Sequence, residues 1–500
     1  MFQWGTVFLP LVELYRTFFG NKIEILFFSI EEIAVLLWVG TLFAAGVFFA
    51  AREHRKKALF LTGTVLAVLF VFLILHAYNA SCFDKSVLPG ADPSFVRECY
   101  YTVRMYLAPI CLVLSVFLLR IPFDRIKRGI LGAGLVIALA ILLTDLFGTS
   151  FASYADGNVV VKGGFFSWFT LSEDADFALY TAKGPFHSAN DMSAVLFAIT
   201  PFAAFSCLKR GKLCDWLLLM ALGLACVMVG TKISSLGFVA ALLATVAVFV
   251  LSALRTKTEK NVRKKLLFSL LILFVYLPLF LISPGKRLQD NRNREAENVY
   301  RPTENVGQIS EVTEKDDSAD LTEEDAKTLA VYLENNHWDH FIDAWFLELY
   351  PVSYDPEFWE TVVVRPNIQN SDTRVFKTEL VGRITEQNGR SLDRLFGIGF
   401  TSGVPYVERD YVNQYYLFGI VGLLVLIVPF FVLFFGGAAK AFCSFWKGRP
   451  FFTQGATLVS LFALFGTAYY AGHVFDTIFP TYFLCVVSAA LVSLRQRDEE

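Results

Sequence analysis

The sequence has few charged residues and keeps them out of its long apolar runs. Only 18% of its 500 residues are charged, whereas 55% are hydrophobic. Outside a doubtful first run, the middle of every run lacks an acidic or basic residue. A charge at the bilayer centre costs about 2.5–3.5 kcal/mol on insertion scales, and ion-coupled carriers accept this cost because they need the charge. The pattern therefore argues against an ion-coupled carrier.

The sequence also lacks the features of a cleavable signal peptide and of a complete metal site. Residues 1–22 lack a basic start and a small-residue cleavage site, so no cleavable signal is expected. His337 and His340 have a metal-like spacing, but no third ligand is fixed by the sequence, and we expect no metal. The chain has eight Cys, and two of them, Cys82 and Cys99, flank one expected outer loop. They either form a disulfide there or remain two thiols.

What the sequence does have is a series of apolar runs of about 18–23 residues, the length that crosses a hydrocarbon core. The first run carries Glu13 and Arg16, so the count is eleven or twelve. The predicted fold class is an all-α polytopic membrane protein. The predicted spans are 4–20, 29–51, 58–79, 103–120, 129–148, 190–208, 214–230, 234–254, 266–283, 412–436, 453–471 and 474–494.

Basic residues set the predicted orientation. Half of all Lys and Arg lie in alternate short turns and in the tail 495–500, which the positive-inside rule makes cytoplasmic. The chain then divides into a membrane region 1–283, an extracytoplasmic loop domain 284–411 and a membrane region 412–500. Loops 80–102 and 149–189 are also expected outside, and the C-terminus inside.

The loop domain has its own predicted pattern. Residues 286–325 are polar and are expected to be a flexible lead-in. One amphipathic helix is predicted over about 322–349, starting with a capping box at Thr322, and it either lies on the membrane surface or packs within the domain. A second, Arg-rich helix is predicted over 372–394. Four aromatic residues are open to sugar stacking or to packing and anchoring: Trp338, Trp345, Tyr354 and Trp359.

Polar residues gather at the predicted outer ends of the spans. This placement suits chemistry on a lipid that carries a diphosphate and a sugar chain, with the diphosphate at headgroup level. Arg and Lys bind phosphate oxygens and stabilise a leaving diphosphate. A sugar hydroxyl that attacks the anomeric carbon needs a general base, normally a carboxylate or His. The residues at the outer ends are Asp145, Lys183, His187, Asn190, Asp191, Lys232, His473 and Asp476.

Four segments make the chain resemble the O-antigen ligase and polymerase superfamily. They are Gly184–Asn190, the turn Gly230-Thr-Lys232, Ser371–Arg374 followed by Leu395–Phe400, and Glu408-Arg-Asp410 followed by Gly419-Ile-Val-Gly422. The likeness covers roughly 180–425, with a weaker echo at 470–476. Lipopolysaccharide ligases carry a His-Asn pair where this chain has Glu408, a difference that favours a polymerase or a ligase acting on another glycan, as in Gram-positive relatives.

The resemblance implies a helical fold like that of family C glycosyltransferases and a bacterial plasma-membrane enzyme without metal or other cofactor. It would join or polymerise an undecaprenyl-diphosphate-linked oligosaccharide onto a glycan or lipid-linked acceptor. Membrane lipid and a polysaccharide export pathway are expected partners, and nucleic acid is not. The alternatives are a peptidoglycan polymerase of the shape-and-division type and a lipid-linked glycan transporter or flippase.

The predicted site residues follow from the motifs and from their charge. The expected base is Glu408 or Asp410, unless both only solvate a membrane entry. The expected diphosphate ligands are Arg374, Lys232, Arg383 and Arg390, although a snorkelling Lys and a solvated Arg face explain the last three equally simply. The expected head or glycan ligands are His187, Asn190 and His473, with Asn190 alternatively a helix cap and His473 an interfacial His.

Overall fold

The structure is a computed structural model, and most of the chain that it describes is helical. Within the described residues, nine helices are long and apolar enough to cross a membrane, and α8 (Leu213–Val229) is a shorter apolar helix. This confirms a mostly helical, multi-pass membrane protein. Each of the twelve predicted spans corresponds to a helix, although α1, α8 and α20 are not among the nine. The described residues are 1–19, 24–25, 28–88, 90–155, 157–257, 261–298 and 321–497.

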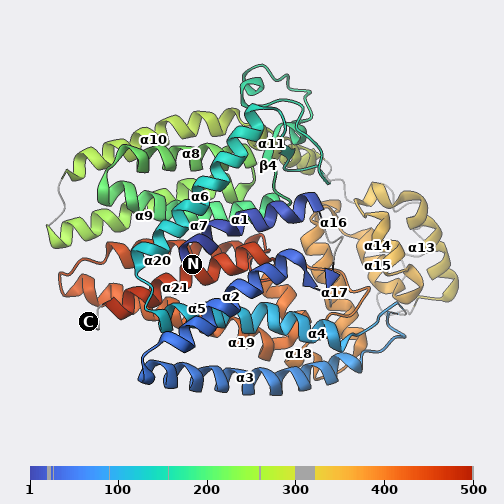
Figure 1. The fold of residues 1–500 in the computed structure, drawn as a ribbon. Coiled ribbons are helices and arrows are strands. Elements are labelled where there is room, and N and C mark those ends of the chain that lie inside the picture. Colours follow the sequence, from blue (N-terminus) through green and yellow to red (C-terminus); the bar gives the residue numbers. More distant parts are fainter. Residues whose placement is uncertain are drawn as a thin grey trace. The chain divides into compact units, whose positions relative to one another are not determined.

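The chain forms two compact units. The first unit comprises Met1–Val71, Cys99–Gln289 and Leu424–Glu500, and the second comprises Phe72–Glu98 and Asp290–Leu423. Figure 1 follows their elements along the sequence. The predicted division at 284 and 411 concerns sides of a membrane and stays a prediction.

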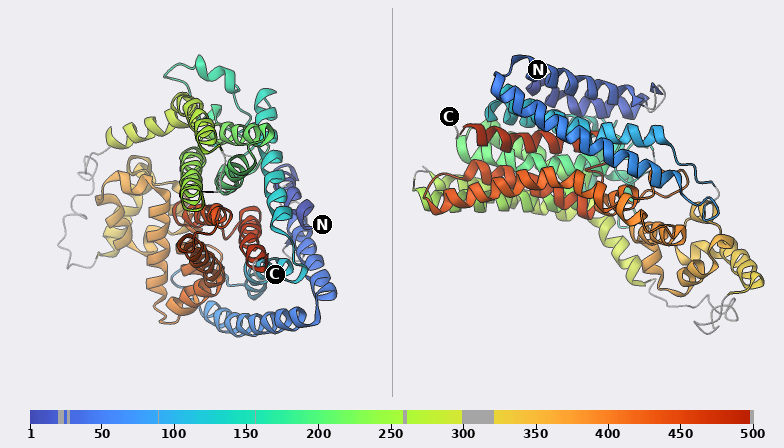
Figure 2. Two further views of the ribbon diagram at one scale, coloured as in Figure 1. Left: turned by 90° about the vertical axis from the view of Figure 1, so that its left-hand side faces the viewer. Right: turned by 90° about the horizontal axis from the view of Figure 1, so that it is seen from below.

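The first unit is a bundle of long apolar helices, whose backbone groups are satisfied internally as a lipid surrounding requires. Figure 2 shows these helices running side by side. They are α1 (Phe2–Phe19), α2 (Ile30–Phe49), the start of α3 (Arg52–Ser81), the end of α4 (Phe95–Thr102), the π-helix η1 (Val103–Leu107), α5 (Ala108–Leu119), α6 (Phe123–Leu146), α7 (Ala189–Arg210), α8, α9 (Lys232–Thr256), α10 (Val262–Ile282), the start of α11 (Pro284–Asn298), the part of α19 (Asp410–Trp446) from Leu424 on, α20 (Phe452–Tyr470) and α21 (Ile478–Arg497).

Helix α7 is the core of this bundle. Nearly all of its side chains are buried, and it packs against α6, α8, α9, α20 and α21. Short strands and 3-10 turns fill the connections, with β1 pairing with β2 and β3 with β4 in antiparallel fashion. These elements are β1 (Glu24–Ile25), β2 (Phe28–Ser29), β3 (Phe151–Ala152), η2 (Phe165–Phe169), η3 (Phe177–Tyr180) and β4 (Ala182–Gly184).

The second unit is built from shorter helices around its own apolar core. That core includes Leu329, Trp359 and Phe376, all essentially inaccessible to solvent. The elements are the ends of α3 and α11, the start of α4, α13 (Glu323–Asn336), η5 (His337–His340), α14 (Ala344–Leu349), η6 (Val352–Tyr354), α15 (Pro356–Val364), α16 (Asn367–Ser371), α17 (Thr373–Asn388), α18 (Asp393–Phe396) and the start of α19.

Two helix predictions for this region need correction, and the flexible lead-in stays a prediction. The single helix over 322–349 is wrong: the capping box at Thr322 is present, but α13 ends at Asn336 and Phe341 adopts a left-handed conformation that separates η5 from α14. The Arg-rich helix ends at Asn388, because Gly389 terminates α17. The predicted flexible lead-in 286–325 starts inside α11, and residues 299–320 of it lie outside the described residues.

The Gly-x-Gly segment and the glycine-containing start of α19 are in direct backbone contact. Ile398 N–H donates to Tyr416 O at 2.9 Å, and Gly399 N–H donates to Leu417 O at 2.9 Å. Gly397 and Gly419 both have positive φ, and a Cβ on Gly397 would lie 2.1 Å from Leu417 O. Only glycine permits this conformation and this approach together. The two glycine motifs therefore pack directly against each other.

Candidate functional site

The second unit brings two cations and one carboxylate together at its surface. Arg374 Nε lies 3.3 Å from Glu408 Oε2, and Lys377 Nζ lies 3.4 Å from Glu408 Oε1. All three side chains are partly exposed: 29% for Arg374, 19% for Lys377 and 28% for Glu408. Contact with water screens an ion pair and lowers its contribution to stability. The cations can therefore exchange their carboxylate partner for a stronger anion.

Local sequence explains this arrangement. Arg374 and Lys377 are three residues apart near the start of α17, so they share one helix face. Asp372 caps α17 by accepting from Arg374 N at 3.1 Å. Val407 is buried in the core, and Val407 N donates to Asn413 Oδ1 at 3.2 Å. These contacts hold the chain on both sides of Glu408 and direct that side chain toward α17.

Asp410, the other predicted base, is fully buried at the start of α19. A buried carboxylate at the first helical turn is favourably placed toward the positive end of the helix dipole. Its role as base stays a prediction.

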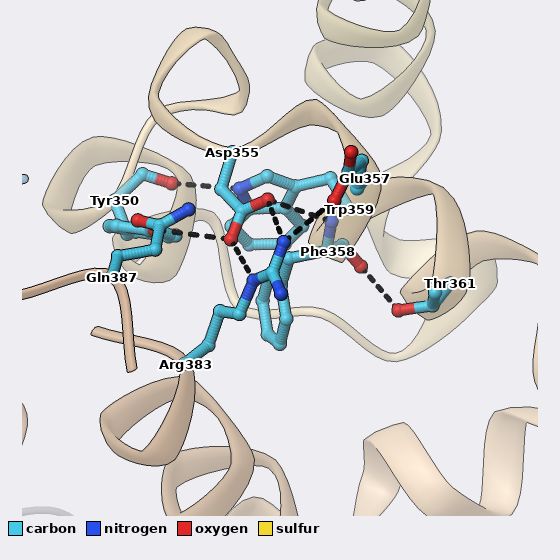
Figure 3. A network of polar contacts seen from close by, with 8 residues as sticks. All are labelled: Tyr350, Asp355, Glu357, Phe358, Trp359, Thr361, Arg383 and Gln387. Carbon is cyan, nitrogen blue, oxygen red and sulfur yellow. Dashed lines mark hydrogen bonds and ion pairs between the residues drawn. The ribbon is translucent and has the colours of Figure 1, made fainter. Parts of the chain in front are cut away.

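Arg383 belongs to a different polar network, shown in Figure 3. Its Nε donates to Asp355 Oδ2 at 2.6 Å, and its Nη2 donates to Glu357 Oε2 at 2.8 Å. Asp355 is buried, caps α15 and also accepts from the Tyr350 hydroxyl at 3.2 Å. The hydrogen bond to Asp355 raises the pKa of Arg383. Diphosphate binding by Arg383 stays a prediction, but these contacts give it a structural role.

Arg390 lies beside a second structural network of the same unit. Its Nη1 donates to Cys82 O at 3.3 Å. Nearby in sequence, buried Asp393 accepts from Asn79 Nδ2 at 2.7 Å and from Asn388 Nδ2 at 2.6 Å. Burial raises the pKa of Asp393. These bonds fix α18 and the Gly-x-Gly segment that follows it.

His76 and Glu98 hold the other side of that segment. His76 Nε2 lies 2.7 Å from Glu98 Oε2, and Phe400 N donates to Glu98 Oε1 at 2.7 Å. His76 Nδ1 lies 2.5 Å from the carbonyl of Phe396, so this nitrogen must carry a proton. These contacts fix the His76 ring and the Glu98 carboxylate on the segment that follows α18.

In the first unit, the starts of α7 and α9 are linked directly. Ser193 Oγ lies 2.6 Å from Thr231 Oγ1, which caps α9. Lys232 follows that cap and is exposed, and Gly230 makes the left-handed turn predicted before it. His187 is exposed, and burial of part of its ring lowers its pKa. The cap of α7 is Ser188, so the interpretation of Asn190 as the cap is wrong.

A buried acidic group lies at the same ends of these helices. Asp191 is fully buried, accepts from Ser188 Oγ at 3.0 Å and lies 4.0 Å from Arg16 Nη1. Arg104 on η1 donates to Asp476 O at 2.6 Å and pairs with Glu32 at 3.3 Å. Burial and the charge of Asp191 raise the pKa of Asp476 to about 7. His473 precedes this loop and is half-buried with a positive φ.

Sequence reasoning missed three charged residues of these groups. Lys377 could have been found from its spacing to Arg374 on a predicted helix. Arg16 was seen only as a reason to doubt the first span, and it pairs with Asp191. Arg104 lies in the predicted span 103–120, and in the structure it contacts Glu32, Tyr100 and the loop at Asp476.

The structure also shows the surroundings of His340 and of the two Cys that flank the loop. His340 is buried and its Nε2 lies 2.8 Å from the Tyr332 hydroxyl, so it belongs to the core; burial lowers its pKa. Across the described ranges, no group of three or more His, Cys, Asp or Glu could hold a metal ion. Cys82 and Cys99 are thiols in the structure and do not form a disulfide.

Comparison with known proteins gives one finding. A family model described as "O-antigen ligase like membrane protein" matches residues 2–496, nearly the whole chain. No curated protein matches the sequence.

Proposed function

Because the chain belongs to the O-antigen ligase-like membrane protein family, we propose that it polymerises or ligates an undecaprenyl-diphosphate-linked glycan at the outer face of the plasma membrane. The family implies a glycosyltransferase-type enzyme that acts on lipid-linked glycans in the membrane. The acceptor is a glycan or a lipid-linked chain.

The reaction is a single displacement. An acceptor hydroxyl oxygen forms a bond to the anomeric carbon, and the bond from that carbon to the diphosphate oxygen breaks. The lipid diphosphate leaves with the electron pair, and the hydroxyl proton passes to a base. Cations that face the departing diphosphate stabilise its developing charge.

The observation that carries the proposal is the group formed by Arg374, Lys377 and Glu408. In the absence of substrate both oxygens of Glu408 face cations. A diphosphate carries more negative charge than a carboxylate and binds the Arg fork bidentately. Its arrival would draw Arg374 and Lys377 away and release Glu408 to accept the hydroxyl proton. Donor binding and base activation are then coupled in one step.

Lys232 and the exposed His187 remain predicted ligands for the diphosphate and the sugar head. The neighbouring N-termini of α7 and α9 favour anions, which supports this role without requiring it. Arg383 and Arg390 are weaker candidates because they already serve Asp355, Glu357 and Cys82 O.

The test uses the full-length protein with its lipid-linked precursor. R374A and E408Q should each lower glycan transfer by about 10²-fold or more, the cost of losing one preorganised electrostatic group or base. The lipid-linked precursor should accumulate outside the cell. The matched controls are K327A and E323Q, which remove an exposed Lys–Glu pair of the same unit at 2.8 Å. Normal glycan output from R374A and E408Q at normal protein levels would overturn the proposal.

A further inference from the structure

Three large apolar side chains of the second unit face solvent on one short segment. Trp338 is 60% exposed, Phe341 44% and Trp345 45%. Trp359, from the same unit, is fully buried and donates through Nε1 to Tyr350 O at 2.9 Å. The structure therefore separates an aromatic residue that builds the core from three that do not. Clustered exposed aromatic residues usually mark a binding surface.

The backbone presents one of these rings in an unfavourable conformation. Phe341 has a φ of 56°, a region that bulky side chains rarely adopt. Its N–H donates to Trp338 O at 3.1 Å, and Ile342 N–H donates to His337 O at 2.9 Å. Ile342 is buried beside it. The turn thus places Ile342 in the core and leaves the Phe341 ring outside.

The charged residues of the chain segment that carries the rings are of one sign. From residue 328 to 364 the sequence contains seven Asp and Glu and no Lys or Arg. Among these acids, Glu334, Asp339, Asp343 and Glu348 are exposed. An acidic surface is repelled by anionic lipid headgroups and by a polyanionic chain. Carboxylates accept hydrogen bonds from hydroxyl groups, and aromatic faces pack against the apolar faces of sugar rings.

We propose that Trp338, Phe341 and Trp345 form a stacking surface for sugar residues that are uncharged or carry amino groups, within the glycan that the enzyme extends or transfers. The inference rests on the proposed function and specifies how the chain of sugars is held apart from the reacting diphosphate. The surface binds glycan and takes no part in the chemical step.

The experiment measures binding of glycan that mild acid has released from the lipid carrier in the producing strain. The full-length protein is held in nanodiscs, and titration is followed by tryptophan fluorescence and checked by calorimetry. W338A/W345A should raise the Kd by about tenfold or more, the loss of a hot-spot contact. W338F/W345F should stay close to wild type, because an aromatic face remains. F166A is the matched control, since Phe166 is 74% exposed in η2 of the first unit.

Three outcomes would overturn the inference: equal glycan binding by W338A/W345A and wild type, dependence of binding on phosphatidylglycerol in the nanodisc, or a polyanionic composition of the bound glycan. The second outcome would identify a membrane-contacting surface instead. Transfer by R374A is measured in parallel. If R374A is inactive while W338A/W345A binds normally, only this inference fails; if R374A is fully active, the proposed function fails.

Discussion

One ion-paired group from each unit shows two different ways of holding charge. In the first unit, Asp191 is fully buried, and Arg104 and Glu32 are at most 14% and 8% exposed. In the second unit, Arg374 and Glu408 are 29% and 28% exposed and their oxygen–nitrogen distance is 3.3 Å. A buried pair cannot release one partner without leaving an uncompensated charge, whereas a partly exposed pair can, because water solvates the partner that is left. Exposure, more than the presence of an ion pair, distinguishes a group able to receive an anion from one that supports the fold.

The strongest way to break this comparison is to displace the segment that carries Glu408. G397A should prevent stable folding of the second unit, because the new Cβ would lie 2.1 Å from Leu417 O at a position with positive φ. The expected loss is several kcal/mol, in the range of severe core substitutions. Thermal unfolding and yield of purified protein measure it. G436A is the control, since nothing lies within 4 Å of its added Cβ; an equally stable G397A would contradict the packing described.

The next prediction compares an arginine from each unit. R104A should lower the free energy of unfolding by about 3–5 kcal/mol, because Glu32 keeps its buried charge without its cation. R374A should change it by less than about 1 kcal/mol while lowering transfer by about 10²-fold or more, because its ion pair is partly exposed to water. Both values come from thermal or denaturant unfolding in one detergent. A large loss of stability in R374A would assign that residue to the fold and remove it from the proposed site.

A further prediction concerns the dependence of stability on pH. The pKa of Asp476 is raised to about 7, whereas an unfolded Asp titrates at about 3.9. Between these values the folded state binds the proton and the unfolded state does not, so stability falls as pH rises from about 4 to about 7. D476N should flatten this decline in a series of melting temperatures. D215N, which alters a buried acid paired with Arg210, should retain it; an unchanged slope in D476N would reject a buried, protonated Asp476.

Much of the helical architecture was predictable because apolar length is a local property. A run of about 20 apolar residues must form a helix in lipid, whatever its neighbours are. The prediction over 322–349 failed for the opposite reason. Its apolar spacing continues past Asn336, but the core of the second unit accepts Leu333 and Ile342 only if the chain turns at Phe341. At this turn, packing in the core outweighed the helical spacing of the apolar residues.

The candidate site was predictable in its residue types and only partly in its groupings. Arg374 and Glu408 were chosen from separate motifs, and the structure pairs them through Val407 and the cap of α17. Arg383 has the same chemistry and the same helix, yet it faces Asp355. No one-dimensional pattern distinguishes two arginines nine residues apart on α17, because their partners come from distant segments.

By itself, the sequence determined that the chain is a multi-pass helical membrane protein and that its motifs are those of a glycan ligase-like family. Both follow from hydropathy and short glycine motifs, which are properties of neighbouring residues in the sequence. Only the tertiary structure decided which cations face a carboxylate at the surface, which are used within the fold, and which tryptophans stay outside the core. The reason is that burial and partner choice depend on segments that are distant in the sequence and are brought together only by the fold.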